Sequence, residues 1–199
     1  MIPDIYTGVK KLIDPLAMSS GRMTPKGVTI HHLADVKIER DIQHLVKEKL
    51  GYHFIIDRNG DVLQTCYTSH SVNHAGVADW NGLSPNRHHI AVSLSSWGAV
   101  TKSGDGFKAW NGTVVPASEV VRRKGNLNAS DYYWHGATVA QEKSLMTLLR
   151  WCILNGIKPV DICGHDECAL PSGRKSDPGG VLSVTMKDLR NALATKPGS

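Results

Sequence analysis

Short apolar runs separated by polar stretches recur along the chain, a pattern that predicts strands. The run at residues 28–31 is β-branched and ends on a histidine, and the run at residues 90–94 is apolar enough to be buried. Both are bounded by polar or turn-forming residues, as strands usually are. The predicted strands cover residues 28–31, 52–56, 62–64, 90–94 and 160–163.

The clearest local signal is Asn59-Gly60, which lies between two of these predicted strands. Two-residue hairpin turns need positive φ angles at their central residues, and Asn-Gly accepts them readily. The sequence therefore predicts a hairpin that joins residues 52–56 to residues 62–64 through a two-residue turn.

Apolar residues at helical spacing predict three helices. Asp35 lies where it could cap the first helix, and Gly51 lies where that helix would stop. Thr138 and Gln141 have the spacing of a capping box at the start of the second helix. The predicted helices cover residues 38–50, 138–155 and 181–194.

Strands and helices alternate, with one hairpin, so we expect an α/β fold with a central mixed β-sheet flanked by helices. The 199 residues suffice for one domain with a proper core, and we expect a single domain over residues 1–199. Residues 1–26 are expected to form an N-terminal arm. Residues 99–136 have no clean periodicity and predict an insertion built from short elements.

Composition narrows the class of protein without choosing a function. Hydrophobic residues make up 41% and charged residues 21%, which is typical of a globular protein, and we expect no membrane span. The first residues lack the apolar core of a signal peptide, so we expect synthesis in the cytoplasm and free thiols at the four cysteines. The net charge of +5 allows acidic partners, but the basic residues are scattered and predict no nucleic-acid partner.

Two histidines follow apolar strands, and this placement is typical of a site built at strand ends. His31 ends the run at residues 28–31, and His165 comes just after the run at residues 160–163. Asp177 follows across a loop that contains proline and glycine. Two imidazoles and one carboxylate give zinc three protein ligands and leave a fourth position open, as in catalytic zinc sites. The thiolate of Cys168 is the alternative third ligand.

Five motifs occur in an order that resembles the type 2 N-acetylmuramoyl-L-alanine amidases. That family includes phage lysozyme-type amidases, peptidoglycan-recycling amidases and peptidoglycan recognition proteins, and the resemblance covers residues 27–193. The motifs are VTIHHLAD at 28–35, GYHFIIDRNGDV at 51–62, HAG at 74–76, HIAVSL at 89–94 and GHDECALPSGRKSDPG at 164–179. The resemblance implies a single amidase domain, without a separate cell-wall-binding domain.

The resemblance also implies a role for each matching residue. It makes His31, His165 and Asp177 the zinc ligands, with Cys168 kept as the alternative to Asp177 because the family uses either a cysteine or an aspartate there. Phage-type members carry a catalytic tyrosine at the start of the strand after the first helix and a lysine two positions before the third ligand. These positions correspond to Tyr52 and Lys175.

Two further features are expected to border the substrate. His74 falls in a segment that lines the cleft in the family, which makes it a candidate substrate contact. Four aromatic residues in the 99–136 region either form a wall for the glycan or stem peptide or pack a small satellite core; they are Trp110, Tyr132, Tyr133 and Trp134.

The implied reaction is hydrolysis of the amide between the lactyl group of N-acetylmuramic acid and L-alanine, with peptidoglycan as the partner and a monomer as the favoured state. Recycling amidases place a glutamate where this chain has Tyr52, so the resemblance favours a phage-type endolysin that acts on the cell wall after release. The alternatives are a cytosolic muropeptide-recycling amidase and a non-catalytic peptidoglycan-binding protein.

Overall fold

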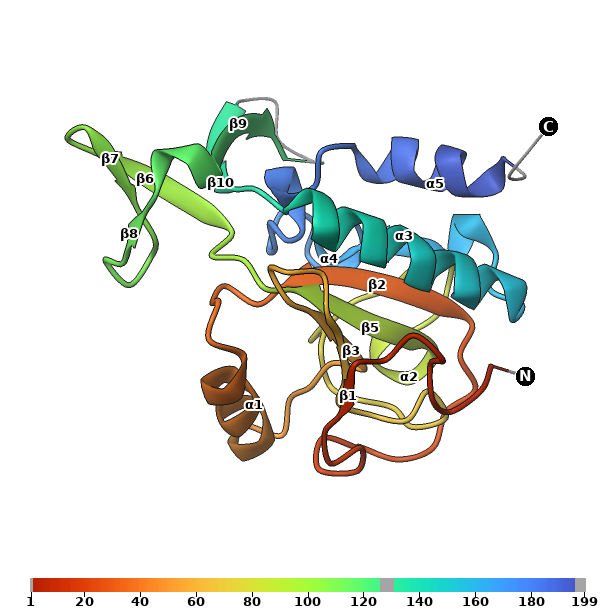
Figure 1. The fold of residues 1–199 in the computed structure, drawn as a ribbon. Helices are drawn as coiled ribbons and strands as arrows, with labels where there is room; N and C mark the ends of the chain where they lie inside the picture. The colour runs from red at the N-terminus through yellow and green to blue at the C-terminus, as the bar shows by residue number, and fades with distance from the viewer. Residues whose placement is uncertain (1, 126–130, 196–199) are drawn as a thin grey trace.

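The structure is a computed structural model that describes residues 2–125 and 131–195, and it has the predicted α/β character (Figure 1). The first part of the chain forms β1 (Lys11–Leu12), β2 (Gly27–His32), α1 (Ile38–Lys47), β3 (Phe54–Ile56), β4 (Val62–Gln64), α2 (Pro85–His88) and β5 (His89–Leu94). The middle forms β6 (Ala99–Ser103), β7 (Gly106–Lys108), β8 (Val114–Val115), η1 (Ala117–Glu119), β9 (Val120–Lys124) and β10 (Asp131–His135). The last part forms α3 (Val139–Leu154), η2 (Pro159–Asp161), β11 (Ile162–Gly164), α4 (His165–Cys168), η3 (Gly179–Val181) and α5 (Met186–Ala194).

The central sheet has six strands in the order β1-β4-β3-β5-β2-β11. β3, β5, β2 and β11 run parallel to one another, and β4 pairs antiparallel with β3, so the sheet is mixed as predicted. β5 is buried along its whole length, which explains its apolar sequence. Because successive side chains of a strand point to opposite faces of the sheet, each strand contributes residues to two different environments.

The two faces of the sheet differ in what covers them. Apolar residues of β2 and β5 pack against α3 and α5 in the main core, and these two helices lie together on one side of the sheet (Figure 1). On the opposite face, Ala91 packs with Leu45 of α1 in a second, smaller cluster. His31 is paired with Ser93 across β2 and β5 and, by alternation, belongs to this second face.

Helix ends depart from prediction where tertiary contacts decide them. α3 begins at the predicted capping box, in which Thr138 and Gln141 each bond the backbone of the other. α1 ends at Lys47, and Lys49 adopts a left-handed φ of 54°, so the predicted stop at Gly51 was wrong. α5 starts at Met186, five residues after the predicted start at residue 181, because the chain forms η3 and a cap at Thr185 first.

The hairpin forms where predicted, but its turn was predicted too tight. β3 and β4 pair from Ile56 and Val62 outward, and Asp57 also bonds Asp61 through the backbone. Gly60 has a φ of +89° and donates its N–H to Asp57, so only one of the two central residues uses a positive φ. The connection is the wider loop in which a turn is followed by one left-handed residue.

Residues 99–136 hold a second sheet, apart from residues 126–130, which lie outside the described part. Its five strands pair antiparallel in the order β8-β7-β6-β10-β9 and project to one side of the central sheet (Figure 1). The prediction of short elements is therefore confirmed, although the sequence did not reveal that they form a sheet. Its small core centres on Trp97, Val100, Ala109 and Val115.

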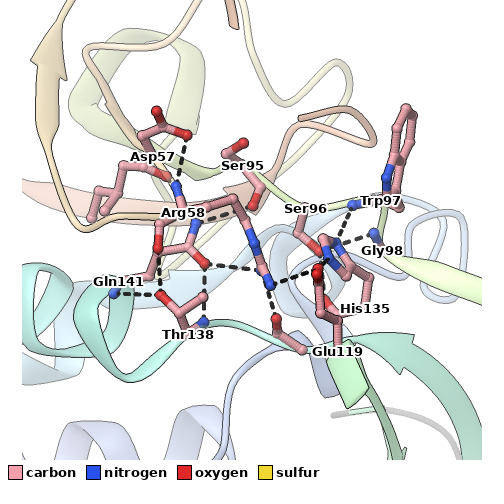
Figure 2. A network of polar contacts seen from close by, with 12 residues as sticks. Asp57, Arg58, Ser95, Ser96, Trp97, Gly98, Glu119, His135, Thr138 and Gln141 are labelled. Carbon is pink, nitrogen blue, oxygen red and sulfur yellow. Dashed lines mark hydrogen bonds and ion pairs between the residues drawn. The ribbon is translucent and has the colours of Figure 1, made fainter. Parts of the chain in front are cut away.

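A polar network joins this second sheet to the central sheet (Figure 2). Arg58 donates to the Gly136 carbonyl at 2.7 Å and to the Glu119 carboxylate at 3.3 Å. Nδ1 of His135 accepts from the backbone N–H of Trp97 at 3.1 Å, and Nε2 of the same ring donates to the Glu119 carboxylate at 2.7 Å. Because these bonds cross between the sheets and involve buried groups, they fix how the second sheet sits on the first.

Candidate metal centre

Three of the predicted site residues meet where β2 and β11 end. His31, His165 and Asp177 each offer one ligand atom, and these three atoms all lie within 4.8 Å of one another. Oδ2 of Asp177 is 2.9 Å from Nδ1 of His31 and 3.0 Å from Nδ1 of His165. β2 delivers His31 as its penultimate residue, and β11 ends one residue before His165, so rigid elements aim both rings.

The remaining ring nitrogens identify the tautomer of each imidazole. A carbonyl can only accept, so Nε2 of His165 donates to the Ala75 carbonyl at 3.0 Å, and Nε2 of His74 donates to the Pro85 carbonyl at 3.1 Å. Nδ1 of a neutral His74 then accepts from Nε2 of His31, 2.9 Å away. In both cluster histidines Nδ1 therefore carries a lone pair directed at Asp177.

The electrostatics of the cluster agree with neutral imidazoles beside an ionised carboxylate. Burial lowers the pKa of His31 to about 4. Burial raises the pKa of the Asp177 carboxyl, and contacts with His165 and His31 lower it well below the usual range only when the rings donate protons to it or carry charge; beside neutral rings, a cation would have to supply that positive charge. The neutral ring of His31 thus lies 2.9 Å from an acidic side chain.

This donor set fits a divalent zinc ion. Two imidazole lone pairs and a carboxylate oxygen that converge without a cation would repel one another, whereas a cation among them would satisfy all three. The outer ring nitrogens bond to a carbonyl or to another histidine, as is usual for imidazoles that bind a metal. Among the described residues, this is the group of histidine, cysteine and acidic side chains that could hold a metal ion.

A family comparison assigns the chain to a known class. The model for the N-acetylmuramoyl-L-alanine amidases matches residues 21–180, which is most of the chain.

The chain belongs to this amidase family.

Solved amidases share its fold. A selenomethionine derivative of AmpD has a TM-score of 0.59 and 16% identity and covers 97% of this chain and 98% of its own. AmiD from E. coli, solved with anhydro-N-acetylmuramic acid-L-Ala-D-γ-Glu-L-Lys, has a TM-score of 0.60 and 21% identity, over 86% of this chain and 58% of that one. The endolysin amidase LysCS from Clostridium intestinale has a TM-score of 0.55 and 16% identity, and the match covers 87% of this chain and 86% of that one. A comparison with curated protein sequences gave no match.

The family match gives the enzyme class of this chain. It is an N-acetylmuramoyl-L-alanine amidase, a hydrolase whose substrate class is peptidoglycan. None of the helices formed by the described residues has the length and apolar character needed to span a bilayer.

The other predicted site residues lie around the cluster in different ways. The ring of half-buried Tyr52 lies 5.1 Å from the ring of His31, and burial, together with the negative charge of Asp177, raises its pKa. Lys175 is exposed. Burial lowers the pKa of His32, and the charge of Lys175 lowers it further, so this ammonium lies within electrostatic range of the residue that follows His31.

Cys168 lies outside the group of three. Its buried sulfur donates to the carbonyl of His165 at 3.6 Å. As expected, all four cysteines are free thiols, and all are buried. His74 lies next to His31, and both of its ring nitrogens are engaged, one by His31 and the other by the carbonyl of Pro85.

Two residues that support the cluster of His31, His165 and Asp177 were not found from the sequence. Arg174 donates to the carbonyls of Ala75 and Val77 at 2.9 and 2.8 Å, and Ala75 is also the acceptor for His165. The guanidinium therefore ties the loop behind His165 to the loop that carries Asp177. Its place next to Lys175 in the RKSDPG motif was the available signal.

Trp134 of β10 is the second supporting residue, and it packs against the segment that follows Asp177. A Cβ at Gly179 or Gly180 would collide with its indole ring, so this segment needs both glycines. The indole N–H donates to the Arg123 carbonyl at 3.0 Å. Only 1% of Trp134 is exposed, which places it in the core and excludes it from a glycan wall.

The remaining aromatic residues of the second sheet divide between core and surface. Tyr133 packs against the small core of this sheet, whereas 47% of Tyr132 and 72% of Trp110 are exposed. The alternative of core packing is therefore confirmed for Tyr133 and Trp134, and the alternative of a glycan wall stays a prediction for Tyr132 and Trp110.

A cavity of about 910 Å³ lies away from the metal cluster. It is lined by residues that precede β2 and β5, among them Lys26 and Arg87, and so borders the opposite ends of the strands. None of the three clustered residues lines it.

Proposed function

We propose that this amidase is zinc-dependent, with His31, His165 and Asp177 as the ligands. The observation that carries the proposal is the convergence of two imidazole lone pairs on one ionised carboxylate oxygen. Asp177 is preferred to Cys168 because its carboxylate meets both imidazoles, whereas the sulfur of Cys168 bonds the carbonyl of His165. The proposed reaction is hydrolysis of the lactyl-L-alanine amide of peptidoglycan.

Zinc, when bound, supplies a Lewis acid that polarises the scissile carbonyl and lowers the pKa of water toward about 7. The chain contributes charge and orientation around it. The ammonium of Lys175 would stabilise the negative charge that develops on the carbonyl oxygen. The hydroxyl of Tyr52 stays protonated because its pKa is raised, so it would orient the attacking water through a hydrogen bond.

His74 is proposed as a positioning residue for His31. Its Nδ1 accepts from Nε2 of His31, and the Pro85 carbonyl fixes its own tautomer. The chain of bonds keeps the lone pair of His31 on the nitrogen that faces Asp177. This role differs from the substrate contact expected from the sequence.

We propose an endolysin role, in which the enzyme cuts intact cell wall. Tyr52 supports this role, since the resemblance implies a glutamate at this position in recycling amidases. The likeness to LysCS supports an endolysin-like fold, and the likeness to AmpD and AmiD equally allows action on soluble fragments. The substrate form therefore has to be tested directly.

The test is release of stem peptide from purified sacculi and from a soluble anhydromuropeptide. The zinc-loaded wild type, the chelated wild type and His165→Ala are compared, with His88→Ala as a control outside the cluster. We expect release only from the zinc-loaded wild type and the control. Release that survives both chelation and His165→Ala would contradict the zinc mechanism.

The two substrates separate the remaining roles. Faster release from intact sacculi supports an endolysin, and activity confined to the soluble fragment supports a recycling enzyme. Binding to sacculi without any release by the zinc-loaded wild type would show a non-catalytic binding protein instead.

A further inference from the structure

A groove next to the amidase centre belongs to neither sheet alone. It has a volume of about 460 Å³, which is within the range of small-molecule sites, roughly 300–1,000 Å³. The chain that leaves β2 forms its floor, beginning at Leu33, two residues after His31. α1 forms one wall and the turn between β7 and β8 forms the other, and both lie on the same side of the molecule (Figure 1).

Trp110 offers an aromatic surface in this groove that is exposed and yet fixed. The side chain is 72% exposed, but its indole N–H donates to the Ala34 carbonyl at 2.7 Å. The turn that carries it is closed by two backbone bonds of Ala109, one to Thr113 and one from Gly112. A large exposed indole with a fixed orientation is a feature of recognition surfaces rather than of ordinary solvent-facing positions.

Asp41 supplies an unsatisfied acceptor on the opposite wall. Its Oδ2 is buried without a hydrogen-bond partner among the described residues. Burial raises the pKa of the Asp41 carboxyl, which shows that water solvates this carboxylate poorly. Because Asp41 lines the groove, a ligand there that donates a hydroxyl or amide hydrogen to this carboxylate would offset that cost.

The polar groups of the groove select against an acidic ligand. Two carboxylates, those of Asp35 and Asp41, line it against one guanidinium, that of Arg40. Arg40 is paired with Asp35 and remains half exposed, so it can still donate to a neutral acceptor such as an acetamido carbonyl. A neutral pyranose matches this set, because its C–H face is apolar and its rim carries hydroxyl donors.

We infer that this groove is a glycan subsite, in which one sugar ring of the peptidoglycan strand stacks on Trp110 and donates a hydrogen bond to Asp41. The inference rests on the proposed function, since the subsite would hold the polymer whose stem peptide is cut at the metal centre. Leu33 connects the two places, because it lines the groove and follows His31 by two residues. The second sheet thereby becomes part of substrate recognition.

The direct test is binding of a β-1,4-linked N-acetylglucosamine tetramer to the full chain by titration calorimetry. This probe has no stem peptide and no lactyl amide, so its binding is independent of the proposed hydrolysis. We expect Trp110→Ala to raise Kd at least tenfold, and Trp110→Phe and Asp41→Asn to raise it severalfold. Val114→Ala, an exposed position on the neighbouring β8, is the matched control and should bind like the wild type.

A kinetic readout completes the test. On intact sacculi, Trp110→Ala should raise KM with a smaller effect on kcat, because the subsite holds the strand and does not touch the scissile amide. Equal tetramer binding by wild type and Trp110→Ala, no binding by the wild type, or binding of free stem peptide that is lost in Trp110→Ala would each overturn the glycan assignment. Tetramer binding that depends on Trp110 in a protein without amidase activity would leave the subsite standing and contradict only the proposed reaction.

Discussion

The two sheets of this amidase differ in how they use their side chains. The central sheet is buried on both faces at β5 and directs its polar residues inward, so that His31 meets two partners at about 3 Å. The second sheet exposes most of β6 and presents Trp110 from a turn. Its junction with the central sheet is polar and includes buried His135.

The two sheets therefore suit different tasks: the central sheet holds ligand atoms in fixed positions, and the second sheet presents an exposed surface. A metal centre needs atoms fixed within a fraction of an ångström, and buried parallel strands provide that rigidity. A surface that binds a polymer needs exposed side chains on a scaffold that tolerates sequence change. A small antiparallel sheet provides such a scaffold. The exception is Trp134, through which the second sheet also supports the segment after Asp177. Four changes test this division, from the largest expected effect to the smallest.

Removing a ligand from the central site should have the largest effect. Asp177→Ala is expected to lower the rate of amide hydrolysis by at least about a thousandfold, because the site loses its only carboxylate and the chemistry that zinc supplies. Zinc content by mass spectrometry and peptide release by chromatography measure the two losses together. Asp105→Ala, at an exposed turn of the second sheet, should retain zinc and activity. A zinc-loaded, active Asp177→Ala would contradict the assignment.

Truncating Trp134 tests the one place where the second sheet reaches the centre. Trp134→Ala should destabilise the protein by about 3–5 kcal/mol, because it empties a fully buried aromatic site. It should also weaken zinc binding, since the Gly179–Gly180 segment loses its packing partner. Urea unfolding and zinc titration measure the two effects, and Tyr132→Ala, at a half-exposed position, should change stability by less than about 0.5 kcal/mol. Equal effects of both variants would remove the proposed link between the sheets.

Lys175 tests whether charge near the centre contributes without binding the metal. Lys175→Met is expected to lower kcat by about 10²–10³-fold while zinc content stays unchanged, as for the loss of one stabilising donor at a developing oxyanion. Lys102→Met on β6 keeps the same change of charge away from the centre and should have wild-type kinetics. A loss of zinc in Lys175→Met, or unchanged kcat, would contradict the assigned role.

The smallest effect is a pH dependence of stability that belongs to the central sheet. Burial lowers the pKa of His53 and of His89 to about 4, so both are neutral in the folded protein. Between pH 6.5 and about 4 the unfolded chain binds these protons and the folded chain does not, so stability falls as pH falls through that window. Each histidine contributes up to about 1.4 kcal/mol per pH unit.

Urea unfolding at pH 7, 5.5 and 4.5 measures this slope. His53→Gln should flatten it in part, because one of the buried histidines with a lowered pKa is gone. His44→Gln, at an exposed position of α1, should keep the wild-type slope. An unchanged slope in His53→Gln would show that other groups dominate the pH dependence.

The sequence predicted the central sheet better than the second one, and the reason is physical. Strands such as 90–94 are continuous apolar runs because both faces are buried, and the capping box at Thr138 is a local signal. β7 and β8 have three and two residues, with too few buried positions to show a period. The turn at Asn59-Gly60 was predicted in place but not in type, because the Asp57–Asp61 pairing is not a local preference of those two residues.

The candidate ligands could be chosen from the sequence because strands and a motif mark them. Their supports could not be chosen, because they depend on contacts between distant segments. Arg174 bonds carbonyls about a hundred residues away along the chain, and Trp134 packs on glycines that follow Asp177. His74 was identified for its position in the HAG motif, but only the structure shows that it faces His31 rather than open solvent.

The central claim is that zinc binds among His31, His165 and Asp177. The most direct test is a crystal structure of the zinc-loaded protein with anomalous data collected on both sides of the zinc absorption edge. The account predicts one strong zinc peak bounded by Nδ1 of both histidines and a carboxylate oxygen of Asp177. A peak that contacts the sulfur of Cys168 in place of the carboxylate would contradict it. So would a protein that hydrolyses the amide and yet shows no zinc peak at this position.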